Sequence, residues 1–420
     1  MSLQKFDSIV IGAGPAGSTS AYVLAKSGFN VLLVERGKVA GSKNVFGGRI
    51  YINPLKEIYP DIEKAPIQRW VKKERISLVA DGCLTLEFQH EKTTSFTAYL
   101  SKIAEWMAGK AEEAGATLVT EITVDSLLVE DGKVKGIVAG GDKVYSDVVV
   151  DAEGINRLLL ERAGIVEKPK PENVALGIKE VIKLSKKDIE DRFGLDDDSG
   201  MAWLMMGDVT KGIPGGGFLY TNQDTVSLGI VVNLGGAIRM IKEYAYEIVE
   251  RMRESPYLKK YLDGGSLVEY SAHLVPQASY KLIPKLYGDG FVVVGDAAGM
   301  LLDLGYTIRG VDLAAYSGYL AAKAIEKAHS SGGITAENLS IYEKMLKESF
   351  VYKQIERFRG TERIFSDARI FTELPEAVTD ILRRMFQIEY ESDKLLNNAR
   401  KVKGGLIRLL LDALKVVRSL

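Results

Sequence analysis

The chain has 420 residues, of which 46% are hydrophobic and 26% charged, and its formal net charge at pH 7 is -1. This length exceeds what one hydrophobic core normally serves, so two or three interleaved domains are expected. The balanced charge gives no general positive field, and we therefore expect no nucleic-acid partner. No apolar run approaches the roughly 20 residues that span a bilayer. No signal-peptide pattern precedes the first predicted strand, so a cytoplasmic protein is expected.

The first predicted unit is a βαβ segment over residues 6–36. An apolar run ends in a glycine-rich turn, a helix-like stretch follows, and a second apolar run ends at Glu35. In this pattern Gly12 allows the tight turn, Gly14 lets the backbone approach a pyrophosphate, and Gly17 lets the helix pack on the strand. Glu35 would accept a hydrogen bond from an adenosine ribose and repel a phosphate on it. The segment therefore predicts a site for FAD or NAD rather than NADP.

The next segment, residues 41–51, is too rich in glycine and polar residues for a core element. Gly47 and Gly48 stand beside Lys43 and Arg49. The segment is either a surface loop with turn glycines or a close neighbour of a flat, anionic cofactor.

Strand and helix patterns then alternate up to a second acidic turn. The predicted elements are a strand over 76–96, a helix over 99–114 and four short strands between 117 and 150. The last strand ends in Asp151 and Gly154. Because ligands collect at the carboxyl ends of strands in open α/β sheets, this turn is expected either near the same cofactor or as a plain strand end.

The only cysteine is Cys83. It can form no intrachain disulfide, and it cannot alone hold an iron–sulfur cluster, which needs about four thiolates. His90, His273 and His329 show no metal-ligand spacing, so no metal site is expected. Cys83 lies in an apolar, strand-like run and is expected to be a small buried side chain. Any electrons that pass through the protein would then be carried by an organic cofactor.

A second, antiparallel sheet is predicted further along the chain. Residues 173–183 read as a strand, and a glycine-rich stretch over 212–220 leads into another strand at 226–232, as in a hairpin. This sheet is the expected substrate domain. Residues 238–261 are predicted to be helical, with a break at Ser255–Pro256 because proline cannot continue the backbone hydrogen bonds of a helix.

A second cofactor element is predicted at residues 290–299. A fully apolar strand ends in Gly295 and Asp296, and small residues follow it. An acid at that strand end accepts a hydrogen bond from a ribityl or ribose hydroxyl, or else it caps the next helix, predicted at 312–323.

Several of these motifs together resemble the FixC family, which is related to electron transfer flavoprotein:quinone oxidoreductase. Besides the glycine fingerprint, the resemblance is carried by Lys43–Tyr51 (KNVFGGRIY), Gly217–Asn222 (GFLYTN), Ala272–Pro276 (AHLVP), Val294–Gly299 (VGDAAG) and Thr307–Asp312 (TIRGVD). The resemblance implies an α/β fold in which a glutathione-reductase type of FAD-binding domain is interleaved with an antiparallel-sheet quinone domain.

The resemblance also implies the residues of the site. Those expected to bind FAD are Gly12, Gly14, Pro15, Ala16, Gly17, Glu35, Arg36, Asn44, Gly47, Gly48, Arg49, Asp151, Gly154, Gly295, Asp296, Gly305 and Thr307. Tyr220 and His273 are candidates for contacting quinone carbonyls, because both can donate hydrogen bonds. The chain departs from the family's usual pattern at Leu100, at Gln277–Ala278–Ser279 and at Asp303.

The predicted domain bounds follow from these motifs. They are 1–75 for the first FAD-binding part, 76–98 for substrate-domain strands, 99–165 for a second FAD-binding part, 166–285 for the antiparallel quinone domain, 286–330 for the FAD-binding part with the Gly-Asp motif, and 331–420 for a helical C-terminal region. Within the last, residues 405–420 are predicted to form a helix whose polar residues Arg408, Asp412 and Lys415 share one narrow stripe. This helix either lies on an anionic membrane surface or packs on this protein or a partner.

The lone cysteine and the resemblance together suggest a function. The chain is expected to be the FAD subunit of an electron-bifurcating complex, taking electrons from the α and β subunits of an electron transfer flavoprotein and delivering them to a membrane quinone. A separate small ferredoxin-like subunit would hold the iron–sulfur cluster. The protein is expected on the inner face of the cell membrane. Alternatives are a geranylgeranyl-reductase-like isoprenoid saturase, a flavin monooxygenase and a non-catalytic FAD-binding scaffold.

Overall fold

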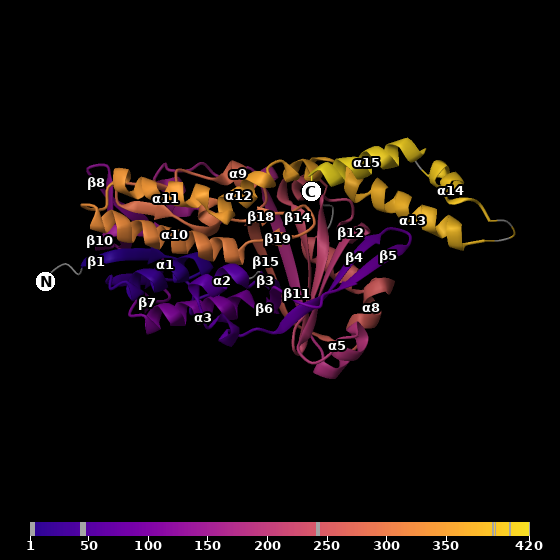
Figure 1. Cartoon of the computed structure of the whole chain (residues 1–420), viewed down its shortest axis with the longest axis horizontal. Coiled ribbons are helices and arrows are strands. Elements are labelled where there is room, and N and C mark those ends of the chain that lie inside the picture. The colour runs from indigo at the N-terminus through magenta and orange to yellow at the C-terminus, as the bar shows by residue number, and fades with distance from the viewer. Residues whose placement is uncertain are drawn as a thin grey trace.

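The computed structural model describes residues 5–42, 48–240, 244–388, 390, 392–402 and 405–419. Two sheets dominate it, and the C-terminal helices extend past the second sheet at one end of the molecule (Figure 1). The predicted α/β fold, with a second, largely antiparallel sheet and a helical C-terminal region, is confirmed.

The first sheet has the strand order β16-β17-β10-β1-β2-β7, and its central strands are parallel. These strands are β1 (Lys5–Ile11), β2 (Val31–Val34), β7 (Thr117–Val119), β10 (Asp142–Asp151), β16 (Tyr287–Gly288) and β17 (Phe291–Val293). An antiparallel ribbon of β8 (Ser126–Glu130) and β9 (Lys133–Ala139) continues from β10. All four residues of β2 are buried, as expected for a parallel strand covered on both faces.

A group of helices shares one core with this sheet, and small residues let two of them cross closely. They are α1 (Pro15–Lys26), α2 (Asn53–Ile58), α3 (Leu100–Glu113), α4 (Leu158–Arg162), α10 (Val311–Ser330), α11 (Ala336–Glu348) and α12 (Phe350–Arg357). The hydroxyl of Ser20 in α1 donates to the carbonyl of Gly318 in α10 at 3.0 Å. A Cβ atom at Gly318 would lie 2.2 Å from the carbonyl oxygen of Ala16, so this close crossing requires glycine.

The second sheet has the order β15-β11-β14-β13-β12-β4-β6-β3, with β5 paired to β4. Its strands are β3 (Gly48–Tyr51), β4 (Arg69–Val79), β5 (Cys83–Gln89), β6 (Ser95–Ala98), β11 (Val174–Lys183), β12 (Ser199–Gly207), β13 (Gly215–Thr221), β14 (Thr225–Asn233) and β15 (Ser266–Pro276). The parallel pairing of β12 with β4 joins the early strands to the later ones.

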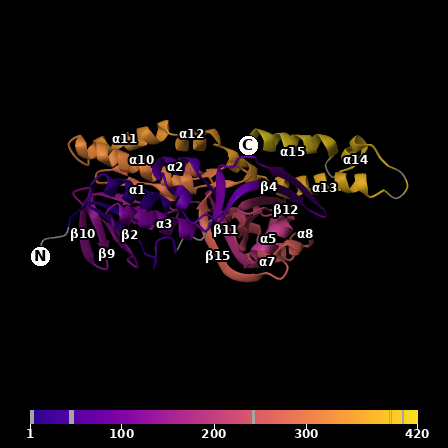
Figure 2. The same ribbon diagram turned by 60° about the horizontal axis from the view of Figure 1, so that its bottom comes forward.

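Helices of the second sheet lie mainly on one of its faces. They include α5 (Lys186–Phe193), α7 (Ala245–Arg253) and α8 (Pro256–Leu262), which share a core with the sheet and lie across it from the C-terminal helices (Figure 2). The predicted break is confirmed, because α7 ends at Arg253 and α8 begins at Pro256. The remaining short elements are α6 (Leu234–Met240), α9 (Ser279–Leu282), β18 (Leu302–Asp303), β19 (Ile308–Arg309) and the 3-10 turns η1 (Ile62–Lys64), η2 (Pro171–Asn173), η3 (Asp208–Thr210), η4 (Gly295–Ala298), η5 (Thr361–Ser366) and η6 (Ala368–Phe371).

The β4–β5 hairpin corrects one expectation. Cys83 was predicted to be buried, but it is exposed. The reason is topological: β5 pairs only with β4, so an apolar, alternating strand here lies at a sheet edge and not in a core. The same hairpin exposes about half or more of the side chains of Ile76, Leu86 and Phe88.

The C-terminal region ends in α13 (Glu373–Phe386), α14 (Leu395–Lys401) and α15 (Gly405–Ser419). The predicted polar stripe of α15 is directed toward the protein. Arg408 pairs with Glu373 at 2.9 Å, Asp412 with Arg369 at 3.4 Å, and Lys415 with Asp367 at 2.6 Å.

The other side of α15 is apolar and faces solvent. Leu410 is 53% exposed, Leu411 61% and Leu414 48%. This orientation is opposite to that of an ordinary surface helix, whose apolar side faces the core. In the part of the chain that the structure describes, no helix has both the length and the apolarity needed to cross a membrane.

Candidate flavin site and its apolar arm

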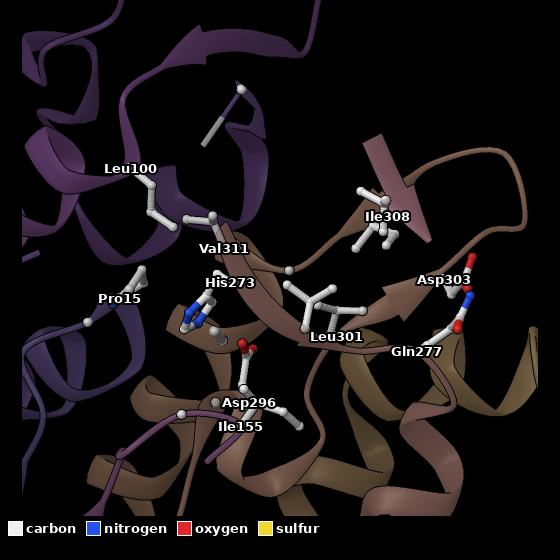
Figure 3. A pocket seen from close by; sticks show the side chains of 18 of the residues that line it. Pro15, Leu100, Ile155, His273, Gln277, Asp296, Leu301, Asp303, Ile308 and Val311 are labelled. Carbon is white, nitrogen blue, oxygen red and sulfur yellow. The ribbon is translucent and has the colours of Figure 1, made fainter. Parts of the chain in front are cut away.

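A cavity of about 770 Å³ lies between the two sheets. Its lining starts at the carboxyl ends of β1, β2 and β10 and continues onto the inner face of the second sheet. Figure 3 shows Pro15 and Leu100 on one side of this space and Leu301 and Ile308 on the other, with His273 and Asp296 between them.

One end of the cavity is the glycine turn before α1. Gly12 adopts φ +95°, and a Cβ atom there would lie 2.5 Å from the carbonyl oxygen of Ala152. Gly14, Pro15 and Ala16 line the cavity, and the first turn of α1 has no side-chain cap. The free backbone N–H groups at this positive helix end are therefore available to an anionic group such as a pyrophosphate.

Glu35 closes this end of the cavity at the carboxyl end of β2. Its carboxylate accepts backbone hydrogen bonds from Ala13 at 2.9 Å and from Gly37 at 2.6 Å. These two bonds fix the position of the carboxylate, and each oxygen keeps a lone pair for a ribose hydroxyl. Arg36 also lines the cavity and adds a positive charge at this end.

Asp296, in η4, points into the middle of the cavity (Figure 3). Burial raises the pKa of its carboxyl group to about 6, although the positive charge of Arg157 lowers it. A carboxylate that is buried and aimed into a cavity needs a hydrogen-bond donor there, and a ribityl or ribose hydroxyl is such a donor.

At the cavity wall, one cation and two further acids form a cluster, in which Glu153 lines the cavity and Asp151 and Arg157 are buried behind it. Arg157 donates to the carbonyl of Leu282 at 2.6 Å, and burial lowers its pKa. Burial raises the pKa of Asp151 well above its ordinary value, and the charge of Glu153 raises it further. Glu153 accepts hydrogen bonds from the backbone N–H groups that begin α4, at 3.0 Å from Leu159. This cluster holds the strand end that carries Ala152 against Gly12.

Two segments face each other farther along the cavity. Gly48 and Arg49 come from β3, while Gly305 and Thr307 come from the loop between β18 and β19. The side chain of Tyr220 contacts both segments, because a Cβ atom at Gly48 would be 2.5 Å from this ring and Thr307 forms a hydrogen bond with the Tyr220 hydroxyl. Burial raises the pKa of Tyr220 to about 12, so the phenol remains a hydrogen-bond donor at neutral pH.

His273 reaches the cavity from β15 of the second sheet. Burial lowers the pKa of its imidazole, and the positive charge of Arg36 lowers it further. The ring is therefore neutral at pH 7, with one nitrogen as donor and the other as acceptor.

Beyond Tyr220 the cavity continues as an apolar arm. It runs between the face of β4 and β12 and the C-terminal elements η5, η6 and α15, and its lining comprises Ile76, Leu78, Leu204, Met206, Ile364, Ile370, Phe371 and Val416. This arm opens next to the exposed residues of the β4–β5 hairpin, since Ile76 belongs to both surfaces.

The structure brings most of the predicted site residues to this one cavity. Those that line it are Gly12, Gly14, Pro15, Ala16, Glu35, Arg36, Gly48, Arg49, Gly154, Tyr220, His273, Gly295, Asp296, Gly305 and Thr307. Gly17 and Asp151 are not among the lining residues: Gly17 packs against the carbonyl of Gly12, and Asp151 lies in the cluster behind the wall. The predicted Asn44 and Gly47 lie outside the described residues.

The structure also places residues in the site that the sequence reasoning did not include. Leu100, which departs from the family pattern, lines the cavity, and so do Gln277 and Asp303. Arg157 follows Asp151 by six residues, and from the sequence it is a possible partner for the acids of that turn. Its hydrogen-bond partners Leu282 and Asp296, in contrast, are more than 120 residues away in the sequence. The apolar arm had no local signal, because it is formed by four distant segments.

The comparisons with known proteins agree with this geometry. Residues 7–165 match the family described as FAD dependent oxidoreductase, and residues 174–275 match the family described as ETF-QO, ubiquinone-binding. Over the whole of both chains, the sequence is 38% identical to the probable electron transfer flavoprotein-quinone oxidoreductase YdiS of Escherichia coli K12 and 40% identical to the protein FixC of the same strain. It is 37% identical to FixC of Azorhizobium caulinodans, over 92% of this chain and 91% of that protein.

Solved structures share the fold at lower identity. A geranylgeranyl bacteriochlorophyll reductase-like protein from Thermoplasma acidophilum matches with a TM-score of 0.73 and 21% identity, over 97% of this chain and 99% of that one. The flavin-dependent brominase Bmp2 matches with a TM-score of 0.66 and 18% identity, over 99% of both chains.

Proposed function

The chain belongs to the FixC family of electron transfer flavoprotein-quinone oxidoreductase-like proteins, which makes it an FAD-dependent oxidoreductase linked to quinone, and we propose that it passes electrons from an electron transfer flavoprotein to a membrane quinone. In this proposal it is one subunit of an electron-bifurcating complex. The observation that supports it most directly is the single cavity that joins a dinucleotide site to an apolar arm.

We place FAD along this cavity by the chemistry of the residues that line it. The start of α1 holds the pyrophosphate, Glu35 the adenosine ribose, and Asp296 a hydroxyl of the ribityl chain. The flavin ring lies between the segments of Gly48–Arg49 and Gly305–Thr307. When bound, FAD supplies the redox chemistry, since it accepts electrons in pairs or singly and passes them on.

The apolar arm fits a quinone with its isoprenoid tail. Aliphatic and phenylalanine side chains line the arm, so an apolar chain gains free energy by leaving water there. At its inner end Tyr220 is a protonated donor that would orient the head group through a quinone carbonyl. The neutral His273 lies nearer Asp296 and Arg36 and would reach a second carbonyl only from the flavin side of the cavity.

The test uses the full-length protein loaded with FAD. The flavin is reduced anaerobically and mixed with a short-chain quinone, and its return to the oxidised spectrum is followed by stopped flow. The proposal expects oxidation at a rate that saturates with quinone concentration. Flavin oxidation no faster than that of free reduced FAD would contradict the proposal. Reduction of the double bonds of an added geranylgeranyl lipid, without any reduction of quinone, would also contradict it.

A substitution within the arm separates quinone access from FAD binding. Leu204, on β12, lines the arm and pairs with Phe218 and Ile76 on the neighbouring strands. Leu204→Trp is expected to slow flavin oxidation by quinone about tenfold or more, because overpacking a filled site costs about 1–3 kcal/mol. FAD content should not change. Leu267→Trp, at an exposed position on β15 that does not line the cavity, is the matched control and should retain the wild-type rate.

The partners are part of the same proposal. With Cys83 as its only cysteine, the chain cannot hold an iron–sulfur cluster alone, so a small ferredoxin-like subunit would hold it. The α and β subunits of an electron transfer flavoprotein would bring the electrons. Affinity purification of the tagged chain from its own organism tests this: all three subunits should co-purify, and their absence would remove the complex from the proposal.

The proposal places the protein on the inner face of the cell membrane, and two exposed apolar surfaces support contact with a membrane. One is the outer side of α15, and the other is the β4–β5 hairpin beside the mouth of the arm. At the end of α13 and just after it, Phe386, Ile388 and Tyr390 are also more than half exposed. Contiguous exposed apolar side chains on a monomer mark contact with a membrane or a partner, and a quinone would enter the arm directly from a bilayer.

Removing the apolar side of α15 is expected to abolish membrane binding. Leu410→Ser, Leu411→Ser and Leu414→Ser together should weaken binding to anionic liposomes at least about a hundredfold, because burying each leucine contributes about 1.5–3 kcal/mol. Co-sedimentation with liposomes measures the effect. The matched control replaces the exposed Leu267, Val268 and Tyr270 of β15 by serine. Equal binding by the α15 variant and the wild type would refute this role of α15.

A further inference from the structure

Two arginines share one aromatic ring beside the cavity. The Cζ atoms of Arg49 and Arg309 each lie 4.8 Å from the centre of the Tyr51 ring. Both distances are within the range of a favourable cation–π contact. Arg49 and Tyr51 lie on β3, whereas Arg309 lies on β19, so the ring joins two segments that are about 260 residues apart in the sequence.

Each arginine is also held by a carboxylate. The guanidinium of Arg49 is bidentate on Glu74, at 3.1 and 2.6 Å. Arg309 donates from its Nε atom to Asp312 at 2.7 Å. Because the planar guanidinium is oriented by its carboxylate, its flat face is free to contact the ring. Two cations would repel each other over one ring unless each had such a counter-charge, and here each has one.

This cluster joins two segments of the cavity wall, both of which contact Tyr220. Arg49 precedes Tyr51 by two residues on β3, and Thr307 likewise precedes Arg309 by two residues. Tyr51 itself does not line the cavity. Arg49 lines the cavity, whereas Tyr51 and Arg309 lie behind its walls, so Tyr51 acts on the cavity through Arg49 and through the backbone of both segments.

We propose that Tyr51 is a positioning residue for the flavin ring, and that through Arg49 and Arg309 it fixes the separation of the two walls between which the ring is held. The inference rests on the placement of the flavin ring under the proposed function. It assigns no contact with FAD to Tyr51. It requires the aromatic face of residue 51 and not its hydroxyl group.

The test compares variants that keep or remove this aromatic face. In Tyr51→Phe the ring is kept, and FAD affinity and the visible flavin spectrum should equal those of the wild type. In Tyr51→Leu the apolar volume is largely kept but the ring is lost, and FAD should bind about tenfold more weakly, as loss of two partly desolvated cation–π contacts implies. The visible absorption band of the bound flavin should also shift, because its surroundings change.

A double-mutant cycle shows whether the effect passes through Arg309. Arg309→Lys keeps the charge beside Asp312 but loses the planar group, and the double variant Tyr51→Leu, Arg309→Lys should bind FAD no more weakly than Tyr51→Leu alone. The matched control is Tyr280→Leu, which removes a ring 3.9 Å from Arg359 and outside this cavity. It should leave the flavin band unchanged.

Three results would overturn the inference: a Tyr51→Phe variant as weak as Tyr51→Leu, additive effects in the cycle, or a Tyr51→Leu variant with wild-type affinity and spectrum. Thermal unfolding of each apoprotein shows whether a variant folds. If Tyr51→Leu does not fold, the FAD affinity and flavin spectrum of the Arg309→Lys variant test the inference. The readouts require only FAD and no quinone. A protein that shows these effects but does not reduce quinone would therefore contradict the proposed function and leave this inference standing.

Discussion

Replacing Gly17 by alanine is expected to produce a protein without FAD. A Cβ atom at this position would lie 1.9 Å from the carbonyl oxygen of Gly12 and 3.1 Å from the Cβ atom of Ala152. Both neighbours are held by the strand ends of β1 and β10, so neither can yield like a flexible side chain. The turn would have to open, and the N–H groups at the start of α1 would lose their alignment on the pyrophosphate.

We expect the Gly17→Ala variant to bind FAD at least about a hundredfold more weakly, which corresponds to a loss of about 3 kcal/mol. The measurements are the flavin content of the purified protein and a fluorescence titration of the apoprotein with FAD. The matched control is Gly109→Ala in α3, where a Cβ atom meets no atom within 4 Å. That variant should retain FAD and gain about 0.5–1 kcal/mol in the free energy of unfolding, because glycine is unfavourable inside a helix. Normal FAD binding by Gly17→Ala would mean that the turn adapts.

The parts of the site that lie close together in sequence could be predicted. Gly12, Gly14 and Glu35 belong to one βαβ unit whose spacing reflects the length of the helix between two parallel strands. Asp296 follows an apolar strand in the same way. In each case a local pattern determines a local geometry, and the sheet then brings the strand ends together.

Features that depend on distant contacts could not be predicted in this way. The alternation around Cys83 indicates a strand, but it does not show that this strand pairs on one side only. The polar stripe of α15 was recognised in the sequence, yet its direction depends on Glu373, Asp367 and Arg369, which are presented by other elements. Whether a polar stripe faces water or a set of counter-charges is a tertiary property.

Replacing Asp296 by asparagine is expected to stabilise the apoprotein and to weaken FAD binding. Burial raises the pKa of this carboxyl group from its ordinary 3.8 to about 6 in the folded protein. The folded state therefore holds the proton more tightly than the unfolded state, and the free energy of unfolding falls as the pH rises from about 4 to above 6. Above that range the carboxylate is charged in both states, and its burial destabilises the fold by at most about 3 kcal/mol, since the difference between 6 and 3.8 is converted at about 1.4 kcal/mol per pH unit.

Asparagine has the same shape and carries no charge at any pH. The Asp296→Asn apoprotein should therefore be more stable than the wild type at pH 7.5, by up to about 3 kcal/mol, and the two should have similar stability at pH 4. Urea unfolding at both pH values measures this difference.

FAD affinity is expected to change in the opposite direction, with the variant binding FAD more weakly than the wild type. The variant loses a hydrogen bond from a hydroxyl to a charged acceptor, which contributes about 1.5–3 kcal/mol and so about tenfold to a hundredfold in affinity. If the variant gained no stability at pH 7.5, burial of the Asp296 charge would not destabilise the protein in the absence of FAD. If the two effects have opposite signs, Asp296 strengthens FAD binding and lowers the stability of the apoprotein.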